Sequence, residues 1–142
     1  IIVMFGDHQP KFGEDFYEEV AKNSPEILAE PQNRYKIPFF IWANYDMQEE
    51  YVEGTSLNYL SSYIYKAAGM TPAPYNRFLI EMEDKIPQIN ANGFYSLNTQ
   101  EYMSFDEATE EEKEWMDRYR QLQYNSIFGG KKRDKALFPI IN

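Results

Sequence analysis

A carboxylate and an imidazole stand side by side where the first apolar run of the chain ends, because Asp7 and His8 directly follow Gly6. Such a pair of oxygen and nitrogen ligands suits Mn²⁺ best, with Mg²⁺ or Zn²⁺ as alternatives. In a regular strand the two side chains would point to opposite faces, so they converge only if the strand ends and the backbone turns, which Gly6 permits. Taken alone, such a pair is more often part of a capped or hydrogen-bonded turn.

The rest of this chain offers few further metal ligands. His8 is the only histidine and there is no cysteine, so a cysteine-type zinc site and thiolate catalysis are excluded. A divalent ion needs four to six ligands, and no later acidic residue has metal-ligand spacing. The chain also begins inside an apolar run and without Met. We therefore expect it to be part of a longer polypeptide whose upstream region supplies the missing ligands.

The elements that would position this pair read as an α/β fold. Residues 1–5 form a continuous apolar run that predicts a strand buried on both faces, as in a parallel sheet covered by helices. Ligand sites in such sheets lie just beyond the carboxyl ends of the strands. Residues 37–43 predict a second strand, with Pro38 at its first residue or on an edge. The helical pattern of residues 14–29 is broken by Pro25 and Pro31, so it predicts a short helix followed by a loop. The whole connection is long enough for a crossover.

Two further helices and one short strand are expected in the middle of the chain. Thr55 or Ser56 would cap a helix over residues 57–68 that stops at Gly69. Pro74 would open a second helix over residues 75–85, with its apolar side chains facing inward. A short strand is expected around residues 94–97.

The last predicted helix begins with a capping box, in which Thr109 is the N-cap and Glu112 lies three residues further on. Gly129 and Gly130 would end it. Its apolar stripe comprises Trp115, Tyr119, Leu122 and Ile127. About residues 105–130 thus form either part of the core or an appended arm. We find no repeat and no domain linker, so residues 1–142 are interpreted as a single domain fragment.

Charge and composition exclude some classes of function. The formal net charge is −9, which argues against nucleic-acid binding because such binding needs basic patches. The short basic run at residues 131–133 is interpreted as a solvated helix end. Residues 1–5 are too few to span a bilayer, and no signal peptide is present. The chain is rich in aromatic residues, with 12 Tyr, 10 Phe and 2 Trp. These rings either pack at the edge of the core or form a platform for stacking sugars.

Several segments resemble one family. Residues 2–10 (IVMFGDHQP) resemble the last metal-binding motif of the lipoteichoic acid synthase-like sulfatases, within the alkaline phosphatase superfamily. Residues 35–45 (YKIPFFIWANY) look like the next strand of that family. Residues 56–60 (SLNYL) and 67–70 (AAGM) resemble its closing helix, and residues 123–130 (QYNSIFGG) are similar to endings of its Gram-positive members. The resemblance covers nearly the whole chain, but only the Gly-Asp-His motif carries chemistry.

The resemblance implies a fold, a site and an activity. The fold would be the C-terminal portion of a sulfatase-like sheet flanked by helices. Asp7 and His8 would bind the divalent cation, and Gln9 and Asn44 would line the substrate groove. The nucleophile in that family is a Thr, which would lie upstream, so this chain holds no catalytic residue and is expected to be inactive by itself. The parent would transfer phosphoglycerol during cell-envelope polymer synthesis, ahead of hydrolysing phosphate or sulfate esters. It would act on an anionic lipid or polymer at the extracellular face of the cell membrane, anchored by N-terminal helices.

A second hypothesis belongs to another class of protein. The chain would then be a non-catalytic module that binds glycan or cell-wall polymer through Trp42, Tyr45 and neighbouring tyrosines. Upstream sequence distinguishes the two hypotheses, because membrane helices followed by a strand-turn-Thr motif favour the enzyme.

Overall fold

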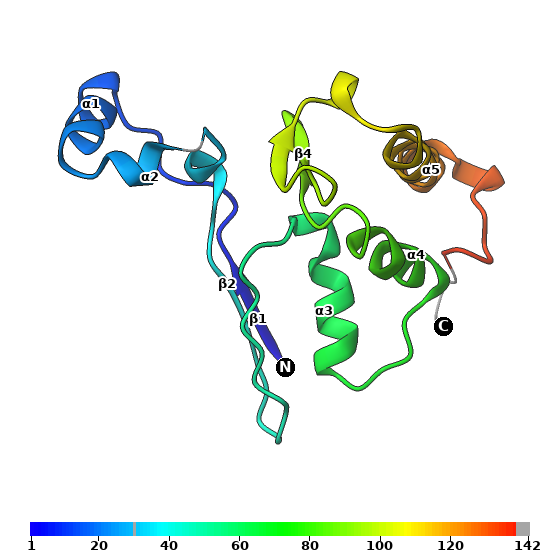
Figure 1. Cartoon of the computed structure of the whole chain (residues 1–142). Helices are drawn as coiled ribbons and strands as arrows, with labels where there is room; N and C mark the ends of the chain where they lie inside the picture. Colours follow the sequence, from blue (N-terminus) through cyan, green and yellow to red (C-terminus); the bar gives the residue numbers. More distant parts are fainter. Residues whose placement is uncertain (30, 139–142) are drawn as a thin grey trace. The chain divides into compact units, whose positions relative to one another are not determined.

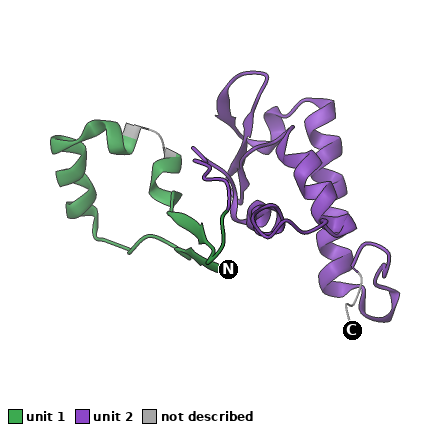
Figure 2. Cartoon of the chain, turned by 90° about the horizontal axis from the view of Figure 1, so that it is seen from below, with its two compact units in different colours: residues 1–46 green, residues 47–142 purple. Residues whose placement is uncertain are grey.

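Helices and short antiparallel strands alternate along the chain (Figure 1). The computed structural model describes residues 1–29 and 31–138. The predicted α/β class is confirmed only as a general combination of helices and strands. The chain divides into unit 1, residues 1–46, and unit 2, residues 47–142, which Figure 2 colours separately. No composition shift in the sequence marks this boundary.

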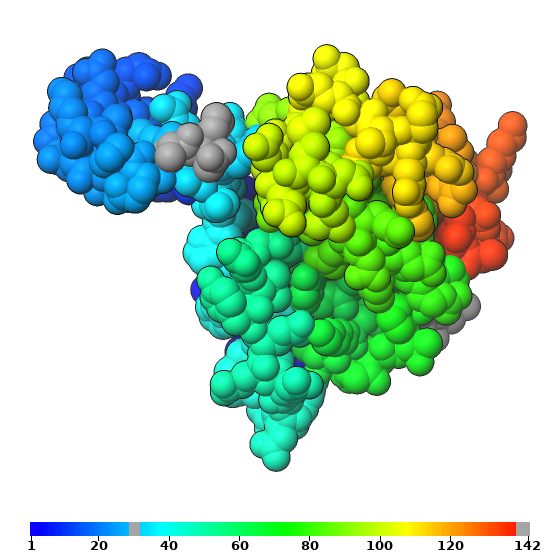
Figure 3. Space-filling view, in the orientation of Figure 1, coloured from blue at the N-terminus to red at the C-terminus, as the bar shows by residue number. Residues whose placement is uncertain are grey.

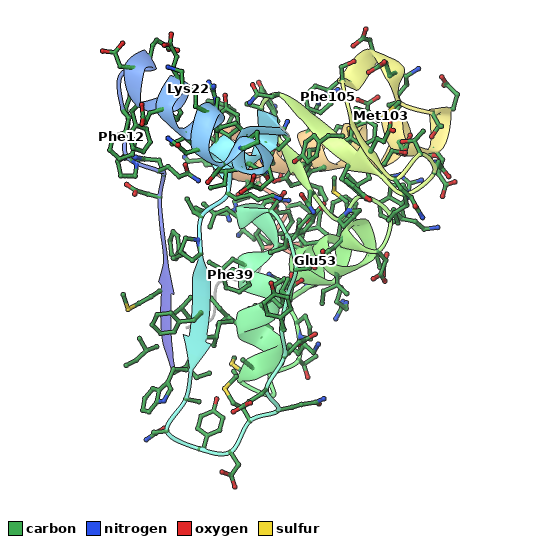
Figure 4. All side chains as sticks on the ribbon, turned by 60° about the vertical axis from the view of Figure 1, so that its left-hand side comes forward. Phe12, Lys22, Phe39, Glu53, Met103 and Phe105 are labelled. Atoms are coloured by element: carbon green, nitrogen blue, oxygen red, sulfur yellow. The ribbon has the colours of Figure 1, made fainter. Side chains whose placement is uncertain are left out.

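Unit 1 contains a two-stranded ribbon. Strand β1 (Ile2–Phe5) pairs with β2 (Phe39–Trp42) in antiparallel register, with Ile2 opposite Trp42 and Phe5 opposite Phe39. The predicted parallel pairing and the predicted burial of β1 on both faces are therefore wrong, since most of β1 is exposed. An apolar run identifies a strand but does not set the direction of its partner, and two strands cannot cover their own faces. Figure 4 shows side chains on both sides of the ribbon, with Phe39 labelled on β2.

The connection between these strands contains the predicted short helix, but the segment after it, predicted as a loop, is helical as well. Helix α1 (Glu14–Asn23) is followed by α2 (Pro25–Ala29) and a 3-10 turn (Pro31–Tyr35). Both prolines begin a new helical segment, because proline fits the first turn of a helix but interrupts its interior. Helix α1 buries no residue. Its first turn is covered instead by Phe12, labelled in Figure 4, whose ring centroid lies 4.1 Å from that of Phe16.

Unit 2 holds the core. A 3-10 turn (Leu57–Tyr59) leads into α3 (Leu60–Ala67), and α4 (Pro74–Glu83) follows; Pro74 is at the first position of α4, as predicted. Gly69 adopts a φ of 62° after α3, the conformation that favours glycine at a helix end. The buried cluster comprises Tyr59, Leu79, Met82, Ile86, Phe94, Ala108, Met116 and Tyr119.

Thr55 and Ser56 do not cap α3 with their side chains. The Thr55 hydroxyl donates to Glu83 at 2.6 Å, and the Ser56 hydroxyl accepts from the Ile89 backbone N–H at 2.6 Å. Both groups therefore join segments about thirty residues apart instead of closing the adjacent helix turn. Local sequence could not distinguish these uses, because a hydroxyl serves either equally well.

Three short strands form a second antiparallel sheet in unit 2, where the sequence predicted only one strand. They are β3 (Ile89–Asn90), β4 (Gly93–Ser96) and β5 (Glu101–Met103), paired in that order. The predicted strand corresponds to β4. Its neighbours are so short, and so mixed in polarity, that they carry no period-two pattern.

The long helix α5 (Glu110–Phe128) ends the core and continues past it. The predicted capping box is confirmed, with Thr109 accepting from the Glu112 N–H, and the helix ends at Gly129. Met116 and Tyr119 are buried, so the first half of α5 belongs to the core. The predicted apolar stripe does not stay in the core along its whole length, because the Ile127 side chain is 70% exposed. The last turn of this 19-residue helix thus lies beyond the buried cluster.

Candidate metal-binding motif at the end of the first strand

The structure brings the Asp7 and His8 side chains together. His8 Nε2 lies 3.5 Å from Asp7 Oδ2, and Asp7 Oδ1 accepts the His8 backbone N–H at 2.9 Å. The strand has ended before Asp7, so the alternation that would separate the two side chains no longer applies. Both side chains are exposed, at 83% for Asp7 and 76% for His8. An exposed pair of this kind adds little to the stability of the fold. Both side chains are accessible to an ion from solvent.

The backbone of Gln9 orients the His8 ring. His8 Nδ1 lies 2.9 Å from the Gln9 carbonyl oxygen. A carbonyl oxygen can only accept, so Nδ1 carries the proton and, in the neutral ring, the lone pair of Nε2 faces Asp7. Histidines that bind metals commonly donate their other ring N–H to a carbonyl in this way. A lone pair and a carboxylate oxygen facing each other repel unless a proton or cation lies between them.

Gly6 serves this turn through its small size. A Cβ at Gly6 would lie 3.2 Å from the Ile37 Cβ, a tight contact. The Gly6 N–H donates to the Pro38 carbonyl oxygen at 3.1 Å, the last ladder bond before the chain leaves the ribbon. Gly6 is not among the glycines with positive φ. Gly6 therefore does not supply the backbone freedom expected from the sequence. Its lack of a side chain instead allows Ile37, in the segment before β2, to lie close to the turn.

The Gln9 side chain also has a structural use. Its Nε2 donates to the carbonyl oxygens of Asn33 and Lys36, at 3.1 and 2.6 Å. These two bonds tie the segment after β1 to the turn that precedes β2. The predicted role of Gln9 in binding substrate remains a prediction, and its amide nitrogen is already engaged.

Asn44 lies at the other end of the ribbon. Because β1 and β2 run antiparallel, the residues after Trp42 sit beside the start of β1, whereas Asp7 and His8 follow its end. Strands rise about 3.3 Å per residue, so the four paired positions separate the two places by well over 10 Å. The structure does not bring Asn44 to the Asp7–His8 pair, and a substrate role for it stays a prediction.

The donor set fits part of a metal shell. Two ligands that each lie about 2.1 Å from one ion at a tetrahedral angle are about 3.4 Å apart, close to the 3.5 Å between Asp7 Oδ2 and His8 Nε2. Within residues 1–29 and 31–138, no three His, Cys, Asp or Glu side chains gather around a common point. Asp7 and His8 would therefore hold an ion only with ligands from elsewhere.

The hydroxyl groups with defined partners in unit 2 have structural uses. Thr109 caps α5 and Thr55 binds Glu83. The Tyr63 hydroxyl also donates to Glu83, at 2.7 Å, and burial together with that carboxylate raises its pKa to about 12. A phenol held protonated in this way is neither a general base nor a nucleophile near neutral pH.

Comparison of the chain with protein-family models, curated proteins and solved structures found no match. The described helices include none with the length and apolar character that crossing a bilayer requires.

Proposed function

We propose that this chain carries two metal ligands of an extracellular phospho- or sulfo-transfer enzyme of the lipoteichoic acid synthase-like sulfatase type. The proposal combines the Gly-Asp-His motif with one observation, the 3.5 Å approach of Asp7 Oδ2 and His8 Nε2 just after β1. Within that type, phosphoglycerol transfer to a cell-envelope polymer is the preferred activity, and hydrolysis of phosphate or sulfate esters is the alternative. The complete sulfatase-like sheet, of which β1 and β2 would be one part, belongs to the same proposal.

The residues of this chain would position the ion. Asp7 supplies a negative oxygen ligand, and His8 supplies the Nε2 lone pair because Nδ1 is held as a donor by the Gln9 carbonyl oxygen. Gly6 and Ile37 keep the turn close to the ribbon. When bound, a divalent cation neutralises charge on the oxygens of a phosphoryl or sulfuryl group and lowers the pKa of a hydroxyl nucleophile. Mn²⁺ is the preferred ion, with Mg²⁺ or Zn²⁺ as alternatives.

The nucleophile and the remaining ligands are proposed to lie in polypeptide upstream of Ile1. Thr55 and Thr109 are engaged in structural hydrogen bonds. Thr71 lies in the irregular segment before α4 and Thr99 in the turn after β4, and neither follows a strand that ends beside an acidic residue and a histidine. Under this proposal the chain is inactive alone, and the longer parent protein acts at the extracellular face of the membrane.

Metal binding tests the proposal without any activity assay. His8 gives a single set of imidazole NMR signals because it is the only histidine. We expect Mn²⁺ to broaden the His8 signals, weakly in these 142 residues and with higher affinity in a longer ectodomain. Asp7→Asn and His8→Ala should each weaken Mn²⁺ binding by about 10-fold or more in that ectodomain, as loss of a ligand does.

Asp46→Asn is the matched control, because Asp46 is exposed and follows β2 at the opposite end of the ribbon. It removes the same charge and should leave the affinity unchanged. Equal affinities of the Asp7→Asn, His8→Ala and unmodified ectodomains would overturn the proposed metal site. Tight stoichiometric binding by the 142 residues alone would mean that the missing ligands lie within them.

A glycan-binding module is the second candidate. It is favoured by the exposure of two aromatic side chains at and just after the end of β2, namely Trp42 at 52% and Tyr45 at 47%. Stacking on sugars would quench or shift the fluorescence of Trp42. A saturable shift with soluble cell-wall glycan that Trp42→Phe abolishes would favour this candidate, and the Asp7→Asn variant would behave normally in that assay.

A further inference from the structure

The last turn of α5 leaves three apolar side chains without cover. Tyr124, Ile127 and Phe128 are 67%, 70% and 68% exposed. Ile127 and Phe128 come three and four residues after Tyr124, so the three side chains lie on one side of the helix. The ring centroids of Tyr124 and Phe128 are 5.1 Å apart. We call these three residues the apolar tip. Figure 2 shows α5 as the long purple helix that leads into the C-terminal loop.

A basic segment follows the apolar tip at once. Residues 131–135 hold four cations, Lys131, Lys132, Arg133 and Lys135, and one acid, Asp134. Their net charge is +3, in a chain whose formal net charge is −9. The ion pairs of the described residues all lie earlier in the chain, so no described carboxylate forms an ion pair with these lysines. In Figure 3 the residues coloured orange to red project at the edge of the view.

Hydrogen bonds hold the basic segment beside the helix end. Asn125 Oδ1 accepts the Asp134 backbone N–H at 2.9 Å, and the Lys132 N–H donates to the Gly129 carbonyl oxygen at 2.8 Å. The Arg133 guanidinium lies 4.6 Å from the centre of the Phe138 ring. Asn125 and Ser126 are half-buried while their neighbours are exposed. The tail thus covers one side of the last turn and leaves the apolar tip open, with the cations next to it.

We propose that the apolar tip and the basic segment together dock the chain on an anionic lipid bilayer. Aromatic and aliphatic side chains insert at the boundary between headgroups and acyl chains, while adjacent lysines meet the negative headgroups. A soluble polyanion would use the cations but not the three apolar side chains. A second copy of this chain would use the apolar side chains but would bring two positively charged tails together. This proposal does not depend on the Asp7–His8 site.

The partition of the full chain between buffer and vesicles tests the docking surface. We expect sedimentation with mixed phosphatidylglycerol–phosphatidylcholine vesicles, weak sedimentation with phosphatidylcholine alone, and release by salt, which screens the charges. The triple variant K131Q/K132Q/K135Q should lower the partition coefficient at least about 20-fold, since each cation near an anionic surface contributes about 5-fold. The double variant I127S/F128S should lower it about 10-fold or more, because less apolar surface enters the bilayer.

The triple variant K11Q/K22Q/K36Q is the matched control. It removes the same charge from exposed lysines outside the basic segment and should leave the partition coefficient within about 2-fold, because none of them belongs to the proposed surface. Equal losses in the two lysine triples would mean that net charge alone governs binding, and would overturn the proposed surface.

The absence of cysteine allows a second readout. A single Cys at Ile127 or at the exposed Glu111 can carry an environment-sensitive fluorophore, and these two positions are 16 residues apart, about 24 Å along the axis of α5. A blue shift with anionic vesicles is expected at position 127 only. Binding with no shift at position 127, or equally tight lysine-dependent binding to soluble polyphosphate, would overturn the proposal. Either result would show that the surface binds a soluble polyanion and not a membrane.

Discussion

Gly93 and Gly54 differ in what a side chain would meet. A Cβ at Gly93 would lie 2.2 Å from the Met103 backbone carbonyl oxygen, whereas a Cβ at Gly54 would lie 2.7 Å from Nε2 of Gln88. The first neighbour is part of the β4–β5 ladder and cannot move without breaking it. The second is the far end of a flexible side chain, which can rotate away. The two positions therefore tolerate a methyl group to very different degrees.

We expect Gly93→Ala to destabilise unit 2 by about 2 kcal/mol or more, as overpacking beside fixed backbone does. Gly54→Ala should change the free energy of unfolding by less than about 1 kcal/mol. Chemical denaturation followed by near-UV circular dichroism measures both values. Similar losses in the two variants would show that the Met103 carbonyl oxygen does not limit the space at Gly93.

For single residues, the sequence predicted that the Asp7 and His8 side chains converge where the strand ends, but it predicted only part of their surroundings. That the strand must end before Asp7 followed from strand geometry. The contact between the Gln9 carbonyl oxygen and His8 could not be predicted, because any backbone carbonyl can accept and sequence does not indicate which one approaches. The position of Asn44 depended on the pairing direction of β1 and β2, which an apolar run leaves open.

Glu112 connects the start of α5 to the three-stranded sheet. Its Oε2 accepts from the Thr109 N–H at 2.9 Å and from the Thr109 hydroxyl at 2.8 Å. Its Oε1 accepts from the Ser96 hydroxyl at 2.6 Å and from Asn98 Nδ2 at 3.3 Å. The capping box was visible in the sequence because its members are three residues apart. The contacts with Ser96 and Asn98 were not visible, since they span 14 and 16 residues.

The same carboxylate makes the stability of unit 2 depend on pH. Burial alone would raise the pKa of Glu112, but the hydrogen bonds from Ser96, Thr109 and Asn98 outweigh it and lower the pKa below its usual value. A lowered pKa in the folded state stabilises the fold above the unfolded value of about 4.3. This contribution is lost as the pH falls through the folded pKa, when the carboxylate takes up a proton.

We expect Glu112→Gln to lower the free energy of unfolding by about 2 kcal/mol at neutral pH, because an amide N–H would face the Thr109 donors. The variant should also lose less stability than the unmodified chain between about pH 5 and pH 3. Glu111→Gln is the control, since Glu111 is exposed and its Lys85 contact is a 3.4 Å surface pair. If the free energies of unfolding of Glu112→Gln and of the unmodified chain changed in parallel with pH, this account would be contradicted.

The whole chain distributes its buried surface unevenly. Every buried residue among those described belongs to unit 2, and helix α1 of unit 1 buries none. The sequence did not predict this division, because the apolar run of β1 is as hydrophobic as a core strand. Composition reports how much apolar surface exists, whereas burial depends on whether another layer lies against it. Helix positions in both units were predicted well, since prolines and capping residues act locally.

Native-state hydrogen exchange should reveal this difference. We expect the backbone N–H groups of Met82, Phe94 and Tyr119 to exchange only on global unfolding of unit 2. The N–H groups of Met4 and Phe40, at hydrogen-bonded positions of the ribbon ladder, should exchange at least about 10-fold faster, because few buried contacts oppose opening there. Equal protection in the two units would show that they unfold together.

Among the described residues the β1–β2 ribbon has no third strand, so β1 and β2 are both edge strands. Ile2, Met4, Phe40 and Trp42 add an exposed apolar face to it. Such a ribbon can recruit a further strand from another molecule and grow by stacking. The net charge of −9 opposes that growth through mutual repulsion. Dilute, low-salt solutions near neutral pH should therefore keep the chain dispersed, whereas acidification toward its pI of about 4.6 should make it precipitate.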